Sequence, residues 1–110
     1  MKKFLVALIC AFSLSAMAAP TCVLKRTANG KIARSTAAVN AFKRANTCPA
    51  TGKASTASCP GYIVDHIKPL CACGEDSPNN MQWQTLADSK AKDKLEDAEC
   101  AALKKSGAVK

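Results

Sequence analysis

Residues 61–93 read GYIVDHIKPLCACGEDSPNNMQWQTLADSKAKD, and the topology of the chain follows from this stretch. The β-branched run at 62–67 is typical of a strand, and a second short strand is expected at 81–84. A loop rich in Gly, Pro, Asn and Asp separates them at 70–80. From Thr85 onward the apolar periodicity becomes helical. The stretch therefore predicts two strands followed by a helix.

A helix is expected on each side of the strands. The Thr85-x-x-Asp88 spacing resembles a capping box, and apolar residues continue at helical spacing to about Lys105, with Gly107 beyond as a stop signal. Upstream, Ser35 is suited to a helix N-cap, and an alanine-rich segment with helical spacing follows it. The sequence thus predicts a small α+β domain with an additional N-terminal helix.

The first 18 residues have the three parts of a secretory signal peptide. Two lysines form a positive start, residues 4–14 are apolar, and a small-x-small cleavage box lies at 16–18. The apolar run is too short to cross a bilayer as a helix. We therefore expect a signal peptide over 1–18 and one domain over 19–110, exported to a periplasm or secreted, with no membrane attachment after cleavage.

The cysteines indicate a disulfide-stabilised domain. Cys10 falls within the signal peptide, and six remain: Cys22, Cys48, Cys59, Cys71, Cys73 and Cys100. An even number in a small exported chain is typical of disulfides. The sequence does not choose among the possible pairings, although Cys48 and Cys59 flank one turn-rich loop and are expected to pair. A structural zinc site, the competing interpretation, needs Cys-x-x-Cys pairs, whereas Cys71 and Cys73 are separated by one residue.

The charge balance favours a polyanionic partner. Without Lys2 and Lys3 the 16 Lys and Arg fall to 14 against 8 Asp and Glu, so the net charge of +8 becomes +6. Basic side chains neutralise phosphates and release counterions, although simple solubility is the competing interpretation. Few aromatic side chains are present to stack on bases, and Trp83 is expected in the core. The candidate contacts to a nucleic-acid backbone are Arg34, Lys43, Arg44 and Lys92.

His66 is the only histidine in the chain and directly follows Asp65. A neutral imidazole can activate water near neutral pH, and carboxylate oxygens suit a hard divalent cation. Adjacent residues of a regular strand point to opposite faces of the sheet. The two side chains can therefore serve one site only if the strand bends or if the site also includes the following helix. With that condition they indicate a single-metal phosphodiesterase site.

The pattern around these two residues resembles the HNH endonuclease family. The matching segments are Asp65-His66-Ile67-x-Pro69-Leu70, Gly74-x-Asp76 and Asn80-Met81-Gln82, followed by a lysine-rich helix. The wider sequence from Arg34 to Trp83 is similar to small exported bacterial proteins of this family. The resemblance implies a ββα-metal core, in which a β-hairpin and a helix clasp one metal ion.

The resemblance implies a role for each matching residue. His66 corresponds to the general base that activates water, and Asp65 to a metal ligand. Asn80 corresponds to the residue that holds the loop and orients the base without binding metal. The last ligand of the family, a His or Asn, falls at Ser89, which is a poor ligand. The neighbouring Asp88 offers a carboxylate in its place, or caps the helix, and the expected ion is Mg²⁺ or Mn²⁺.

The leading interpretation is an exported, metal-dependent HNH endonuclease with nucleic acid, expected to be DNA, as its substrate. No base-reading module is visible, so little sequence specificity is expected. Ser89 favours a second interpretation, a non-catalytic basic module that binds nucleic acid on a degenerate HNH scaffold. A third is an exported interaction protein with no nucleic-acid role. The sequence predicts no oligomeric state.

Overall fold

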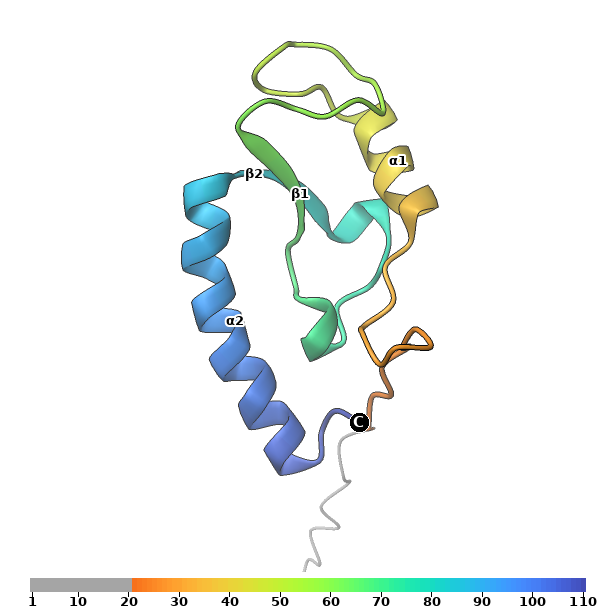
Figure 1. Cartoon of the computed structure of the whole chain (residues 1–110), viewed down its shortest axis with the longest axis vertical. Coiled ribbons are helices and arrows are strands. Elements are labelled where there is room, and N and C mark those ends of the chain that lie inside the picture. The colour runs from red at the N-terminus through yellow and green to blue at the C-terminus, as the bar shows by residue number, and fades with distance from the viewer. Residues whose placement is uncertain (1–20) are drawn as a thin grey trace, which may run out of the picture.

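The computed structural model describes residues 21–110, so the expected signal peptide lies outside the described residues (Figure 1). These residues form an α+β domain, as the sequence predicted. No helix in the described part is long and apolar enough to cross a membrane. The elements in chain order are α1 (Thr36–Ala45), β1 (Tyr62–His66), the 3-10 helices η1 (Leu70–Ala72) and η2 (Pro78–Asn80), β2 (Met81–Thr85) and α2 (Leu86–Ser106).

The two strands form an antiparallel hairpin whose register runs from Tyr62 opposite Thr85 to His66 opposite Met81. Paired residues of an antiparallel sheet lie on the same face, so Tyr62, His66 and Trp83 share one face, and Asp65 lies on the other. The strands begin where the sequence predicted, but β1 ends one residue earlier and β2 ends one residue later. The loop predicted between them contains η1 and η2.

Helix α1 covers the face of the hairpin that carries Trp83. The hydroxyl of Ser35 accepts a hydrogen bond from the backbone N–H of Ala38 at 3.1 Å, which confirms the predicted N-cap. Phe42 is buried and meets the Trp83 ring edge-on, with ring centroids 5.5 Å apart. The indole N–H of Trp83 donates to the carbonyl oxygen of Asn46. Trp83 is therefore fixed between α1 and the hairpin.

Helix α2 begins and ends close to where the sequence predicted. The Thr85 hydroxyl accepts from the backbone N–H of Asp88, and the backbone N–H of Gly107 donates to Lys104. Gly107 has a φ of 80°, a left-handed conformation that glycine adopts without the steric penalty of a side chain. The chain then turns back, and Lys110 exchanges backbone hydrogen bonds with the segment that begins at Cys22 (Figure 1).

Three disulfides support a small core. Cys48 pairs with Cys59, as predicted, and the other pairs are Cys22 with Cys73 and Cys71 with Cys100. In residues 21–110 the buried apolar side chains are Phe42, Cys48, Cys59, Leu70, Ala72, Met81 and Val109. Such a core contributes little hydrophobic stabilisation, and each disulfide adds about 2–4 kcal/mol. The disulfides indicate an oxidising, non-cytoplasmic environment.

Two of the three disulfides end in the segment that follows β1. Cys71 joins it to α2, and Cys73 joins it to the first described residues of the chain. The next residue, Gly74, lies so close to the start of the loop that a Cβ there would be 1.9 Å from the carbonyl oxygen of Lys68 and 2.9 Å from the Asn80 side-chain nitrogen. Only glycine fits at this position.

We expect Gly74→Ala to lower the free energy of unfolding by about 3 kcal/mol, because the new methyl group forces the loop away from Lys68. Denaturant unfolding followed by tryptophan fluorescence measures the loss. Gly52→Ala is the control for a glycine in open space: Gly52 has a left-handed φ of 69°, which an alanine adopts only with strain, but no atom lies within 4 Å of the position of a Cβ. It is expected to cost about 1 kcal/mol. Equal losses in the two variants would contradict the crowding at position 74.

Candidate functional site

His66 lies at the end of β1 and is buried, with 5% of its surface exposed. Its Nε2 is 3.0 Å from Oδ1 of Asp76. The other oxygen of Asp76 accepts the backbone N–H of Ser35 at 2.6 Å. An ionised carboxylate can only accept hydrogen bonds, so Nε2 carries a hydrogen, and in the neutral imidazole the lone pair is then on Nδ1. Asp76 thus fixes the orientation and the tautomer of the imidazole.

The side chain of Asn80 closes the loop between the strands. Its oxygen accepts the backbone N–H of Lys68 at 2.9 Å, and its nitrogen donates to the carbonyl oxygens of Lys68 and Glu75 at 2.9 and 2.8 Å. Its own carbonyl oxygen accepts the N–H of Ile67 at 2.8 Å. The resemblance implied this loop-holding geometry for Asn80, and its effect on a reaction stays a prediction.

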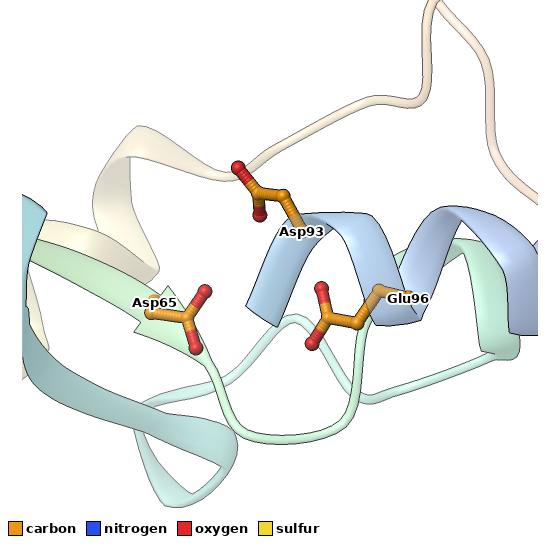
Figure 2. A group of neighbouring side chains, drawn as sticks. All are labelled: Asp65, Asp93 and Glu96. Atoms are coloured by element: carbon orange, nitrogen blue, oxygen red, sulfur yellow. The ribbon is translucent and has the colours of Figure 1, made fainter. Parts of the chain in front are cut away.

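Three carboxylates converge beside His66. Asp65 comes from β1, and Asp93 and Glu96 come from one side of α2; each offers an oxygen within 4.8 Å of the other two (Figure 2). Residues three apart on a helix are neighbours, which brings Asp93 and Glu96 together. Carboxylate oxygens are the ligands that Mg²⁺ and Mn²⁺ prefer, so the donor set fits the metal implied by the resemblance.

Lys92 lies within this acidic group. Its Nζ is 2.9 Å from Asp65 and 2.8 Å from the carbonyl oxygen of His66, and it also pairs with Glu96. Burial lowers the pKa of Lys92, but hydrogen bonds and charges from Glu96 and Asp65 outweigh burial and raise the pKa above its ordinary value. The ammonium therefore stays charged at neutral pH and partly neutralises the acidic group.

A cavity of about 430 Å³ lies between β1, α2 and the segment that follows β1. Its lining includes Arg34, Asp65, His66, Ser89, Asp93 and Glu96. Asp65 and His66 lie on opposite faces of the hairpin, yet both line this cavity together with residues of α2. The site therefore includes the following helix, which was one of the two conditions set by the sequence.

The structure separates the two residues considered for the last ligand position. Ser89 is buried and lines the cavity. Asp88 is exposed in the first turn of α2, and the carboxylates that meet Asp65 within residues 21–110 are Asp93 and Glu96 instead. At this helix start the backbone N–H of Asp88 donates to the Thr85 hydroxyl, so Thr85 is the N-cap, and a capping role of the Asp88 side chain stays a prediction.

The four predicted phosphate contacts have different surroundings. Arg34 is exposed and borders the carboxylate cavity, and Lys43 lines a neighbouring cavity together with Arg34. Arg44 is exposed in the last turn of α1, and it is not among the residues that line these two cavities. Lys92 points into the acidic group rather than toward open solvent.

Three residues of the site were not predicted as such from the sequence. Asp76 belongs to the matched motif, but no local signal indicated that it would reach His66. Asp93 and Glu96 could have been found from helical spacing, since Asp93 stands four residues after Ser89 and Glu96 three residues after Asp93 on α2.

Comparison with known proteins adds no family to this description. No family model, curated protein or solved structure matches the chain. The function is therefore argued from the motif residues and from the geometry of the site.

We expect Lys92→Gln to lower the free energy of unfolding by about 1–3 kcal/mol, because Asp65 and Glu96 lose a partly buried cation. Mg²⁺ should raise the melting temperature of this variant more than that of the unaltered protein, since no ammonium competes for the same oxygens. Thermal unfolding with and without Mg²⁺ measures both effects. Lys94→Gln, an exposed change on the same helix, is the control. Identical Mg²⁺ shifts in Lys92→Gln and the unaltered protein would refute the competition.

Proposed function

We propose that the protein is an exported, metal-dependent endonuclease of the HNH type, which hydrolyses nucleic-acid phosphodiester bonds, those of DNA above all, with little sequence specificity. One observation carries the proposal: a buried imidazole fixed by a carboxylate borders the same cavity as three further carboxylates. The order of a hairpin and then a helix agrees with the ββα-metal core that the motif residues imply.

His66 is the general base in this proposal. Because Asp76 holds the hydrogen on Nε2, the lone pair on Nδ1 is free to take a proton from the attacking water. Asp76 then stabilises the imidazolium, and the N–H of Ser35 keeps Asp76 in place. A positioned general base contributes about 10²–10⁴-fold to a rate.

Asp65, Asp93 and Glu96 are the residues that hold the metal in this proposal. A divalent ion bound there supplies Lewis-acid stabilisation of the charge that develops on the phosphate and the leaving oxygen. The Lys92 ammonium contacts two of these carboxylates and so competes for the same oxygens. Arg34 borders the cavity and can orient a phosphate through paired hydrogen bonds from its guanidinium group.

The pairing of Lys92 favours a second candidate function, a non-catalytic module that binds nucleic acid. The Lys92 ammonium offsets one of the three negative charges of the acidic group, which lessens the repulsion of a phosphate when no metal is bound. The basic net charge of the chain suits the same role. This candidate requires salt-sensitive DNA binding without cleavage.

A plasmid-nicking assay tests the two candidates. We expect purified, oxidised protein to nick supercoiled DNA in Mg²⁺ or Mn²⁺ and to lose this activity in EDTA. His66→Ala should lower the nicking rate by about 10²–10⁴-fold, because no other group replaces the general base. Lys94→Gln should nick at the normal rate. Metal-independent binding with no cleavage by the unaltered protein would reject the nuclease and support the binding module.

A second comparison tests which carboxylates hold the metal. We expect Asp93→Asn to weaken Mn²⁺ binding by about tenfold or more and to slow nicking, since the amide removes one negative charge from the acidic group. Asp88→Asn, an isosteric change one turn away on the same helix, should leave both unchanged. Isothermal titration with Mn²⁺ and the nicking rate are the two measurements. Equal effects of the two variants on Mn²⁺ affinity and nicking rate would mean that Asp93 is not a metal ligand.

A further inference from the structure

His66 also borders a second cavity, on the side of the hairpin that faces α1. This cavity has a volume of about 280 Å³, and its lining includes Arg34, Lys43, Ser58, Tyr62, His66 and Trp83. It shares Arg34, Ile63, Val64 and His66 with the carboxylate cavity. The two cavities therefore adjoin along β1, with the imidazole between them.

The two cavities differ in charge. The first is lined by the carboxylates of Asp65, Asp93, Glu96 and Asp97 together with Arg34. The charged residues that line the second, in the described part of the chain, are Arg34 and Lys43, apart from the titratable His66. Lys43 is half-buried in the last turn of α1 and is one of the residues that line the second cavity. A phosphate group is attracted to the second cavity even without a metal ion.

The second cavity also carries aromatic surface. Tyr62 and Trp83 lie diagonally across the hairpin on one face, and both line the cavity. Trp83 is already held by Phe42 and by its hydrogen bond to Asn46, so little side-chain entropy is lost when a ligand contacts its ring. The sequence alone predicted that Trp83 lies in the core. In the structure Trp83 packs against buried Phe42 and also lines the second cavity.

The size of the second cavity suits a small ligand. Pockets for small molecules range over about 300–1,000 Å³, and a cavity near the lower end of that range suits one nucleoside rather than a stacked pair of bases. Cations beside aromatic rings form the usual combination in sites for single-stranded nucleic acid.

We propose that this second cavity is a nucleotide subsite, which takes one unpaired base against Tyr62 and Trp83 while Arg34 and Lys43 contact the adjoining phosphates. The inference rests on the proposed function, because it places the scissile phosphate at His66, between the two cavities. A base in a duplex must leave its stack before it can enter, at a cost of a few kcal/mol. The substrate class is therefore single-stranded or locally unpaired nucleic acid.

Trp83 provides the readout, because it is the only tryptophan in the chain. In EDTA, we expect an oligothymidylate strand to quench its fluorescence and to bind about tenfold tighter than a strand of equal length that lacks all bases. A duplex of the same length should bind more weakly than the single strand. Fluorescence anisotropy of labelled strands gives each affinity independently of Trp83.

Two variants separate contact with the base from contact with phosphate. Tyr62→Leu keeps an apolar side chain and should reduce the preference for the normal strand over the abasic one, with the abasic affinity unchanged. Lys43→Gln should weaken both strands equally and reduce the slope of log affinity against log salt by about 1. Lys94→Gln, on the other helix, should change neither quantity. Circular dichroism checks that each variant is folded.

Equal affinity for the normal and the abasic strand, tighter binding of the duplex, or binding without any change in Trp83 fluorescence would each overturn the subsite. The nicking assay in Mg²⁺ is read separately. If the protein cuts DNA but binds the normal and the abasic strand equally, the proposed subsite is wrong and the proposed nuclease activity stands. If the protein prefers the normal strand over the abasic strand but never cuts DNA, the proposed subsite stands and the proposed nuclease activity is wrong.

Discussion

The rest of the site depends on one carboxylate. Asp76 accepts the backbone N–H of Ser35 with one oxygen and contacts Nε2 of His66 with the other, so it ties the start of α1 to the end of β1. A buried imidazole without a partner would carry the cost of an unsatisfied polar group. With Asp76 in place the ring is oriented, its tautomer is set, and α1 is anchored over the hairpin. The position of α1 in turn places Lys43 and Phe42 beside the same face.

The loop that carries Asp76 is held by covalent and polar constraints rather than by a core. Cys71 and Cys73 fasten it to α2 and to the first described residues, and Asn80 closes it with three side-chain hydrogen bonds. A domain of this size buries too little apolar surface to position such a loop by packing alone. The disulfides therefore serve the site as well as the overall stability, because two of the three end between His66 and Asp76.

The elements could be predicted from the sequence because their signals are local. Ser35 marks the start of α1 through its side-chain hydroxyl, and Gly107 marks the end of α2 through its left-handed backbone. The β-branched run at 62–67 needs no distant partner to favour a strand. The contact of His66 with Asp76 depends on the course of the loop between the strands, and the meeting of Asp65 with Glu96 depends on how the hairpin packs against α2. Periodicity does not encode that packing. For the same reason the sequence left open which cysteines pair beyond Cys48 and Cys59.

The charged residues on the two sides of His66 differ in sign, so the site is electrostatically asymmetric. The cavity on the α2 side is lined by carboxylates, and the Lys92 ammonium pairs with Asp65 there. The cavity on the α1 side is lined by Lys43, and Arg34 borders both cavities. A phosphodiester strand approaching the hairpin is attracted on one side and, without a cation, repelled on the other. The strand can therefore lie in one orientation more easily than in the reverse. Because the acidic side tolerates a phosphate only when a cation neutralises it, substrate binding and cation binding at the proposed site should reinforce each other.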